Sequence, residues 1–379
     1  MTQPGRLIRM PEGFEAFVPN PLPPQFPWTS RMIHALSDAD RAIGRLAGEG
    51  RRLPNPHVLM RPFIAREAVL SSRIEGTLAT LGELLAAEAG AVVDRSPDDL
   101  REVANYVVAL GYGMQQLPNQ PLSIRLLQEI HEKLLQGVRG DLALPGTIRS
   151  VQNWIGLPGS TPHTASYVPP PPSELAGLLH SLEAFFADTS LPPLVQIALT
   201  HYQFEAIHPF LDGNGRVGRL LITLFLIQRA ILPMPLLYLS AFFEATRSEY
   251  ITRLHAVTTE GDWENWLLYF VNGVARQSED AEDRASRITN ILDVWRLRVA
   301  GLGSETPART LELLAGNPFV TAKRVSEHLG VARSTASRAI DNLVKLGIVI
   351  QSDDRSRDRA YCAQELLDVM NEPARISPM

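Results

Sequence analysis

The chain has 379 residues, of which 45% are hydrophobic and 20% are charged. This length and composition suit about two or three globular domains and exclude a wholly disordered chain. The 36 Lys and Arg against 41 Asp and Glu leave a net charge of −5, which excludes a globally basic coat for nucleic acid or membrane but not a local basic patch.

The single cysteine, Cys362, excludes an intramolecular disulfide and fits a reducing compartment. Residues 1–17 lack the apolar segment of a secretory signal. The longest apolar stretch, around residues 220–232, is interrupted by polar side chains and is too short to span a bilayer. We therefore expect a cytoplasmic protein without a membrane partner.

Proline is the unusual residue type in this composition, with 29 residues, several of them in clusters. Residues 19–27 cannot form a helix because each proline removes a backbone donor, so we expect a Pro-rich N-terminal arm over residues 1–30. A second cluster at residues 168–172 predicts polyproline II directly before a helix that begins near Ser173.

Most of the remaining chain has apolar residues at three- and four-residue spacing, which is typical of helices. Strand-like alternation is scarce, and the best hairpin candidate is residues 147–168, two short arms around a turn rich in Gly, Pro, Ser and Thr. The expected fold class is mainly α. Its helical segments are residues 59–88, 98–116, 122–137, 173–187, 192–206, 216–231, 247–258 and 263–300.

The C-terminal residues 304–379 differ from the rest, with three short helical segments and then a polar hairpin. This order resembles a winged helix-turn-helix, with residues 333–345 as the recognition helix and residues 349–362 as the wing. Thr321 and Ser334 stand where N-caps are expected. Between residues 317 and 362 there are eight Lys or Arg and five Asp or Glu, a balance of 8 − 5 = +3. Because this balance is only weakly basic, DNA binding and protein docking both remain open as functions of this region.

The most informative segment is residues 208–219, which joins two helical stretches. Gly213 and Gly215 flank Asn214, so the backbone can adopt positive φ and turn several N–H groups toward one point. The next helix begins there and adds its unpaired N–H groups and its positive dipole end. This arrangement predicts an anion site.

Charged side chains extend this predicted site. Arg216 and Arg219 lie three residues apart, on one face of the helix, and suit more than one phosphate. Asp212 is a hard oxygen ligand suited to Mg²⁺. His208 has an ordinary pKa near neutrality and can accept a proton. A DGNG turn alone is common, but a turn needs neither the paired arginines nor the upstream histidine.

The segment HPFLDGNGRVGR resembles the Fic motif, HxFx(D/E)GNGRxxR, of the Fic-domain adenylyltransferases, and it matches at every defined position. The resemblance implies a helical bundle with a short β-hairpin flap that binds protein targets. It also implies transfer of AMP from ATP to a Tyr, Thr or Ser hydroxyl of a protein, including this chain itself. The domains that we expect are an N-terminal helical region at 31–115, a Fic core at 116–275, a connecting helix at 276–303 and the winged helix-turn-helix at 304–379.

The resemblance also implies roles for single residues. The catalytic residues would be His208, which deprotonates the incoming hydroxyl, Asn214, which with the neighbouring amides stabilises the α-phosphate, and Arg216, which holds the β-phosphate. Asp212 would hold Mg²⁺ and Arg219 the γ-phosphate. The expected ATP-binding set is Ser72, Gly213, Asn214, Gly215, Arg216, Val217, Gly218, Arg219 and Tyr250, with Ile251 beside it.

Upstream, Ser71, Glu75 and Gly76 match the (S/T)xxxE(G/N) inhibitory motif of the Fic family. By itself this segment reads as an ordinary helix end with a glycine terminator. In a chain that also carries the Fic motif, the resemblance implies that Glu75 forms a bidentate ion pair with Arg219 and occupies the arginine that the γ-phosphate needs. The inhibition would act within one polypeptide.

Several alternatives stay open from the sequence. A Fic-fold relative can transfer another nucleotide or a phosphate-containing group, or remove AMP from a target. From a different class, the chain can be a nucleotide-sensing, DNA-binding transcriptional regulator. A homodimer through the apolar faces of residues 263–300 is an open arrangement, and the target protein is unknown.

Overall fold

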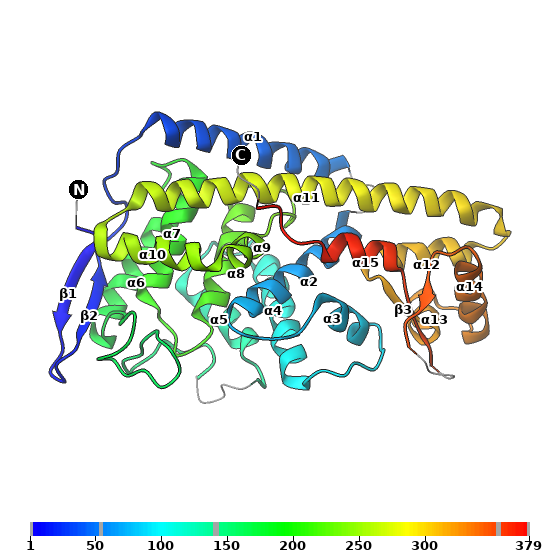
Figure 1. Ribbon diagram of the computed structural model, residues 1–379, viewed down its shortest axis with the longest axis horizontal. Coiled ribbons are helices and arrows are strands. Elements are labelled where there is room, and N and C mark those ends of the chain that lie inside the picture. The colour runs from blue at the N-terminus through cyan, green and yellow to red at the C-terminus, as the bar shows by residue number, and fades with distance from the viewer. Residues whose placement is uncertain (1–2, 53–55, 139–143, 354–357, 377–379) are drawn as a thin grey trace.

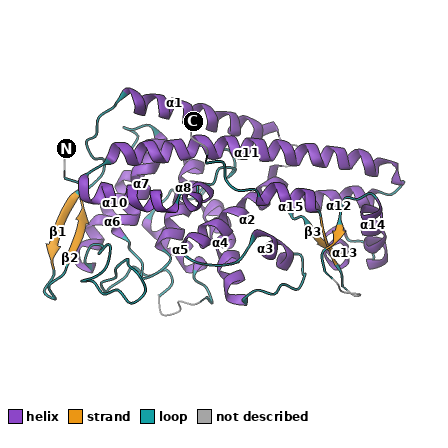
Figure 2. Cartoon of the chain, viewed as in Figure 1, coloured by secondary structure: helices purple, strands orange, loops and turns teal. Residues whose placement is uncertain are grey.

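The computed structural model describes residues 3–52, 56–138, 144–353 and 358–376 (Figure 1). Helices dominate, and the strands form two small antiparallel sheets, one toward each end of the molecule (Figure 2). The prediction of a mainly α fold is confirmed. Within the described ranges, no helix is long and apolar enough to cross a membrane.

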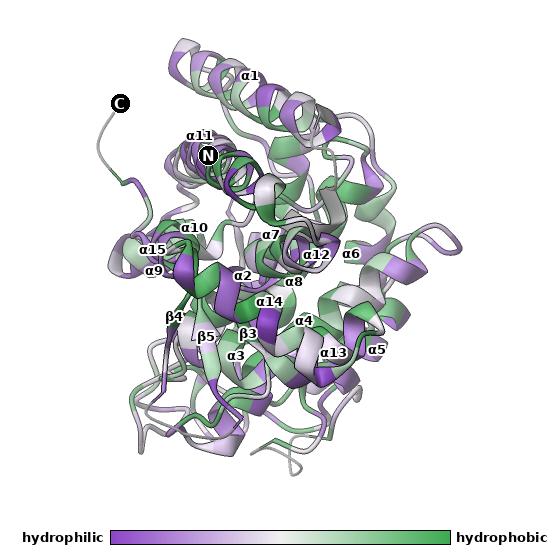
Figure 3. Cartoon of the chain, turned by 90° about the vertical axis from the view of Figure 1, so that its right-hand side faces the viewer, coloured by the Kyte–Doolittle hydropathy of each residue, from purple (hydrophilic) through white to green (hydrophobic). Residues whose placement is uncertain are grey.

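Two long helices lie side by side along one edge of the molecule. Helix α1, Ser30–Arg52, packs along α11, Trp263–Val299, which a 3-10 turn at Ala300–Leu302 extends (Figure 1). Helix α1 alternates hydrophilic and hydrophobic segments, as a surface helix does (Figure 3). Its buried side has Met32, Leu36, Ala39, Ile43 and Leu46 at three- and four-residue spacing, an apolar pattern that the predicted segments, which begin at residue 59, did not include.

Helices α7, Pro193–Ile207, and α8, Asn214–Gln228, occupy the interior and are buried on nearly all sides. A helix that is buried all round must be enclosed by other elements, and these two are. The loop between them, residues 208–213, therefore projects from a rigid base. The enclosing helices include α4 Pro97–Gln116, α5 Ile124–Leu134, α6 Pro172–Phe186, α9 Ser240–Ala245 and α10 Arg247–Glu260.

The segment predicted as one helix over residues 59–88 forms two. Helix α2, Pro56–Ile74, ends where Gly76 takes a φ of +99°, a left-handed conformation that glycine adopts without a steric cost. Helix α3, Leu81–Glu88, starts with a capping box in which Thr80 and Glu83 satisfy each other's backbone N–H groups. The break presents Glu75 at the end of α2.

The hairpin predicted over residues 147–168 is reduced to one bridging pair, in which Ile155 and Tyr167 exchange backbone hydrogen bonds of 2.8 and 3.1 Å. The rest of the segment is loop: Gly156, Pro158, Gly159 and Pro162 lie between the two paired residues, and four consecutive prolines follow Val168. The second proline cluster is as predicted: Pro171 has polyproline II angles, φ −65° and ψ 155°, directly before α6.

The N-terminal arm contains a hairpin that the sequence did not indicate. Strands β1, Gly5–Arg9, and β2, Glu15–Pro19, pair antiparallel with Leu7 opposite Phe17. Strand β2 lies against the end of the 147–168 segment, where Phe17 N–H donates to Val168 C=O at 2.9 Å. Such short strands depend on this tertiary support rather than on their own propensity.

The C-terminal region has the predicted winged helix-turn-helix order. Its three strands pair antiparallel in the order β3-β5-β4. Thr321 caps α13 as predicted, with its hydroxyl accepting from Arg324 N–H at 3.2 Å. The prediction for Ser334 is wrong, because Ala332 is the N-cap of α14 and Ser334 lies inside the helix. The elements are α12 Glu305–Gly316, β3 Phe319–Thr321, α13 Ala322–Leu329, α14 Arg333–Lys345, β4 Ile350–Gln351, β5 Ala360–Cys362 and α15 Gln364–Asn371.

This region docks on the end of α3. The Asn317 carboxamide donates to Leu85 C=O at 2.9 Å, and the Thr321 hydroxyl donates to Ala89 C=O at 3.1 Å. Arg324 donates to Glu88 C=O. These side chains satisfy carbonyls that a helix C-terminus leaves unpaired. The winged helix-turn-helix is thus joined to the segment that follows Glu75.

Candidate active site

The loop between α7 and α8 is closed by its own hydrogen bonds. His208 takes a left-handed conformation with φ 50°, and Gly213 does so with φ 75° directly before α8. The Asn214 carboxamide accepts from Phe210 N–H at 2.8 Å and donates to Phe210 C=O at 2.9 Å. Asn214 therefore holds the shape of the loop. A contact with a substrate phosphate would have to use its second amide hydrogen.

His131 supports this loop from α5, a role that the sequence did not signal. Its Nδ1 accepts from Gly146 N–H at 2.8 Å, so its proton lies on Nε2, which donates to Asp212 C=O at 2.9 Å. The ring stacks on Phe210 with centroids 3.8 Å apart. Burial lowers the pKa of His131 to about 4, so the ring is neutral at pH 7.

Arg149 is a second support that sequence reasoning missed. The side chain is buried, and its Nε donates to His208 C=O at 2.8 Å while Nη2 donates to Pro170 C=O at 2.5 Å. It thereby ties the backbone of His208 to both ends of the 147–170 loop. The residues around Arg149 form no motif, so nothing in the local sequence indicates this role.

The imidazole of His208 is oriented as a base. Its Nδ1 lies 3.3 Å from Glu205 C=O, and because a carbonyl only accepts, Nδ1 carries the proton. Nε2 then keeps its lone pair. Burial lowers the pKa of His208 to about 4, so the neutral form dominates at pH 7.

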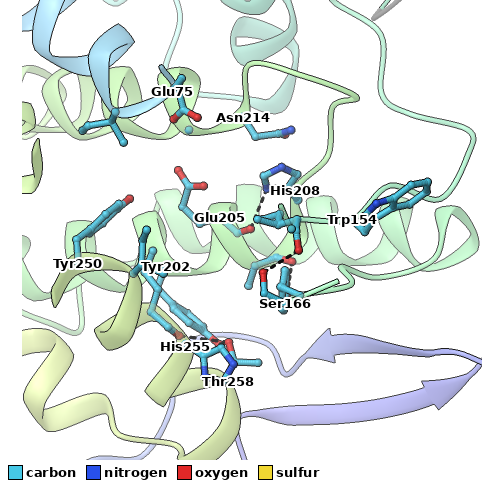
Figure 4. A pocket seen from close by; sticks show the side chains of 18 of the residues that line it. Glu75, Trp154, Ser166, Tyr202, Glu205, His208, Asn214, Tyr250, His255 and Thr258 are labelled. Carbon is cyan, nitrogen blue, oxygen red and sulfur yellow. Dashed lines mark hydrogen bonds between the residues drawn. The ribbon is translucent and has the colours of Figure 1, made fainter. Parts of the chain in front are cut away.

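A cavity of about 560 Å³ opens beside His208 (Figure 4). His208, Glu205 and Tyr250 point into the same space, with Glu75 and Asn214 on its other side. This volume suits a small-molecule ligand. The other walls come from the 147–168 loop and from α10, with Trp154, Ile155, Gly156, Ser166, Ile251, Leu254, His255 and Thr258.

Glu205 is a wall residue that the sequence analysis did not select. It lies one helical turn before His208, and its Oε1 is buried without a hydrogen-bond partner among the described residues. Burial raises the pKa of Glu205 to about 7. A Cβ at Gly218 would collide with this carboxyl group, which explains the glycine at that position.

Arg219 meets the segment that contains Glu75. Its Nη2 donates to Glu75 Oε1 at 2.7 Å, and its Nε and Nη2 donate to Ser71 Oγ and Ser71 C=O at 2.8 and 2.9 Å. The predicted ion pair is present, but it is not bidentate: Glu75 accepts from Nη2 alone, and Ser71 accepts from Nε and Nη2. Gly215 has room for no side chain, since a Cβ there would collide with the Glu75 carboxylate.

Arg216 faces a different direction from Arg219. Its Nη1 lies 3.7 Å from Glu102 Oε2 and its Nη2 lies 3.7 Å from Asp212 Oδ2, and its Nε and Nη1 are buried without hydrogen-bond partners among the described residues. The two arginines are neighbours on one side of the helix, and both charges act on Glu75, but they contact different carboxylates. The helix turns by about 100° per residue, so a three-residue step leaves them about 60° apart.

The cavity gathers most of the predicted site but not all of it. Tyr250 and Ile251 line it, and the Tyr250 hydroxyl bonds to His201 Nε2 at 2.8 Å. Four residues of the predicted ATP-binding set do not line the cavity in this structure. Those residues are Ser72, Arg216, Val217 and Gly218, while Gly213, Asn214, Gly215, Arg219 and Tyr250 do line it.

Family models match this chain in three places. The Fic/DOC family N-terminal model matches residues 33–115, and the Fic/DOC family model matches residues 121–226, which include the loop and the paired arginines. Residues 33–226 thus carry the two Fic/DOC regions. A MarR family model matches residues 304–360, in the winged helix-turn-helix.

Named relatives agree with this assignment. Protein adenylyltransferase fic-1 of Caenorhabditis elegans is 31% identical over 216 residues, which are 56% of this chain and 39% of the relative. Protein adenylyltransferase Fic of Drosophila grimshawi is 31% identical over 167 residues, 42% of this chain and 32% of the relative. The chain therefore spans two fifths or less of the length of these relatives.

Solved structures show the same Fic fold. A Fic family protein from Desulfovibrio desulfuricans has a TM-score of 0.59 at 21% identity, covering 90% of this chain and 98% of that one. Fic-1 from C. elegans has a TM-score of 0.52 at 24% identity, covering 68% of this chain and 74% of that one. The predicted fold is confirmed by these neighbours.

The donor set of the Fic loop fits a magnesium ion that shares its shell with a nucleotide. Asp212 offers a carboxylate whose side chain is 54% exposed at the cavity. Across the described ranges, no group of three or more His, Cys, Asp or Glu is placed to hold a metal by itself. Mg²⁺ is typically held by one or two carboxylates together with substrate phosphates, which matches this arrangement.

The environment of His208 has a measurable consequence. We expect its NMR titration midpoint near pH 4 instead of the ordinary 6.5, because burial disfavours the imidazolium. The unfolded chain then binds this proton more readily than the folded chain. His208 should therefore contribute a loss of stability as the pH falls from about 6.5 to about 4. A midpoint near 6.5 would contradict the buried, neutral assignment.

Proposed function

We propose that this chain is a protein adenylyltransferase that moves AMP from ATP to Tyr, Thr or Ser hydroxyls of proteins, itself included. The observation that carries the proposal is one cavity in which a neutral imidazole with a free Nε2, a helix N-terminus and a buried arginine converge. The names of the relatives that share the Fic domain support it.

The triphosphate would bind where α8 begins. The first N–H groups of this helix, at Asn214, Gly215 and Arg216, have no partner within the helix and point toward the loop. Gly213 N–H is already used, because it donates to Asp212 Oδ1 at 2.6 Å. The developing charge on the α-phosphate would therefore meet the amides that follow Gly213.

The chemical step needs one base and one fixed phosphorus. His208 Nε2 takes the proton of the incoming hydroxyl, whose oxygen then forms a bond to the α-phosphorus. The bond from that phosphorus to the bridging oxygen breaks, and pyrophosphate leaves. Arg219 holds the γ-phosphate and Arg216 contributes positive charge near the β-phosphate. Mg²⁺ on Asp212 would neutralise charge between the α- and β-phosphates.

We also propose that Glu75 inhibits this reaction within the same chain. The carboxylate sits on the Arg219 nitrogen that a γ-phosphate would use, at 2.7 Å. Burial lowers the pKa of Arg219, but the neighbouring negative charges, that of Glu75 foremost, and the hydrogen bond to Glu75 together outweigh burial and raise this pKa, so the pair stays charged. An ATP that enters without displacing Glu75 would lack its γ-phosphate contact, and its α-phosphate would be misplaced.

Substitution Glu75→Gly should raise self-labelling with α-labelled ATP and Mg²⁺ by at least tenfold, because Arg219 becomes free for the γ-phosphate. Mass spectrometry of the modified chain should show an AMP adduct. The matched control is Glu244→Gln, which changes a carboxylate that faces Arg73 at 3.6 Å outside this contact. Adding Arg219→Ala should abolish the gain. Labelling at the wild-type level in Glu75→Gly would show that the inhibition is not intramolecular.

Substitution His208→Ala should separate chemistry from binding. In the Glu75→Gly background we expect AMP transfer to fall by a factor of 100 or more, since general base catalysis is lost. ATP affinity measured by calorimetry should change by less than threefold, because the phosphate ligands stay in place. A matched loss of ATP binding would show that His208 holds the nucleotide instead of activating the hydroxyl.

DNA is a second candidate partner, through the winged helix-turn-helix. Arg333, Arg338 and Lys345 on α14 are exposed in this structure, which favours a phosphate-binding face. Arg324 does not contribute, because it is bound to α3. The MarR family match supports this second proposal.

Full-length protein should then bind random-sequence duplex DNA with a salt dependence set by about three phosphate contacts, a log–log slope near −3. Arg338→Ala should reduce the slope by about 1. Arg31→Ala, at the exposed start of α1, is the control and should leave the slope unchanged. Fluorescence anisotropy at two salt concentrations measures both. Binding that ignores salt, or that Arg338→Ala leaves intact, would count against DNA.

A further inference from the structure

Arg219 has a partner that remains when Glu75 is removed. Of its three hydrogen bonds to the α2 segment, two go to Ser71, one to the hydroxyl at 2.8 Å and one to the carbonyl at 2.9 Å. Ser71 is fully buried, so water cannot replace it. The guanidinium therefore keeps its orientation even when the carboxylate of Glu75 moves away.

The Ser71 hydroxyl passes this interaction on to helix α4. Because Ser71 Oγ accepts from Arg219 Nε, its own hydrogen is free to turn toward the buried Tyr106 hydroxyl. Burial raises the pKa of Tyr106, and the neighbouring Ser71 hydroxyl opposes that rise. The Tyr106 hydroxyl in turn donates to Glu67 Oε1 at 3.0 Å. Ser71 and Tyr106 thus lie between the cation Arg219 and the carboxyl group of Glu67.

Glu67 is a buried carboxyl group that the proposed chemistry does not use. Oε1 accepts from the hydroxyls of Tyr106 and Ser240, at 3.0 and 2.5 Å, and Oε2 accepts from Ser240 N–H at 3.2 Å. Burial raises the pKa of Glu67, and these three hydrogen bonds and the charge of Arg219 oppose that rise. Glu67 lies one turn before Ser71 and two turns before Glu75, so all three share one face of the α2 segment.

We propose that Glu67, Tyr106 and Ser71 form a positioning relay that holds Arg219 in the orientation a γ-phosphate requires, independently of Glu75. This inference rests on the proposed function. It changes the role of Ser71: the residue belongs to the inhibitory motif by resemblance, yet the relay makes it necessary for the active state as well. Glu67 is the fixed acceptor at the end of this relay, whereas Glu75 is the partner of Arg219 that can move away.

The relay predicts a loss that depends on the third phosphate. In the Glu75→Gly background, Tyr106→Phe keeps the buried ring and removes only the hydroxyl. We expect ATP affinity to fall about tenfold, the effect of one hydrogen bond in a charged network, and ADP affinity to stay within twofold. Calorimetry with ATP and with ADP measures this ratio. A merely structural role would weaken both nucleotides alike.

Two further variants sharpen the test. Ser71→Ala should reproduce the selective loss of ATP affinity, and Ser71→Thr, which keeps the hydroxyl, should restore it. Tyr112→Phe is the matched control, because Tyr112 lies on the same helix α4 and its hydroxyl bonds to Glu129 at 2.9 Å, outside the relay. It should change neither affinity.

The outcomes separate the two proposals. If Glu75→Gly binds neither nucleotide, the proposed function is wrong and the relay is overturned with it. If it binds ATP and the ratio of ATP to ADP affinity is unchanged in Tyr106→Phe and in Ser71→Ala, the relay alone is overturned. The relay alone is also overturned if Ser71→Ala, with Glu75 intact, raises self-labelling to the level of Glu75→Gly, because Ser71 would then serve inhibition and not the active state.

Discussion

The arrangement around the cavity depends on one buried, charged guanidinium group. The side chain of Arg219 is only 2% exposed, and a buried charge is tolerable only where opposite charge and hydrogen bonds compensate it. The chain supplies both from the α2 segment, through Ser71 and Glu75. Under the proposed function, the guanidinium that binds the γ-phosphate is charged and oriented before that phosphate arrives, which is the form of preorganisation that electrostatic catalysis requires.

The loop before α8 shows how few residues set this geometry. Gly213 provides the left-handed turn, whereas Gly215 and Gly218 lie inside the helix and leave room for the carboxyl groups of Glu75 and Glu205. Glycines of one motif thus have two different physical functions. Asn214 closes the loop through the backbone of Phe210, and the shape of the loop follows from that closure.

The winged helix-turn-helix contacts both helices that flank Glu75. Asn317 and Thr321 bond to carbonyls at the end of α3, and α12 and α15 pack on α2. Arg66 on α2 also donates to Glu372 C=O at 3.2 Å. The segment that carries Glu75 lies between α2 and α3, so both of its neighbours are held by the C-terminal region. A Fic core and a MarR-like region therefore share a mechanical connection in this chain.

The sequence alone determined the helical class, the Fic loop and the segment that contains Glu75. Local spacing encodes helices, and His208, Asp212, Arg216 and Arg219 lie within twelve residues. Only the tertiary structure decided what surrounds them. His131, Arg149, Tyr106 and Glu67 reach the site from other helices and loops, and nothing in their local sequence distinguishes them from ordinary core or surface residues. Their roles arise from burial, which makes each unpaired polar atom costly and selects partners across the fold.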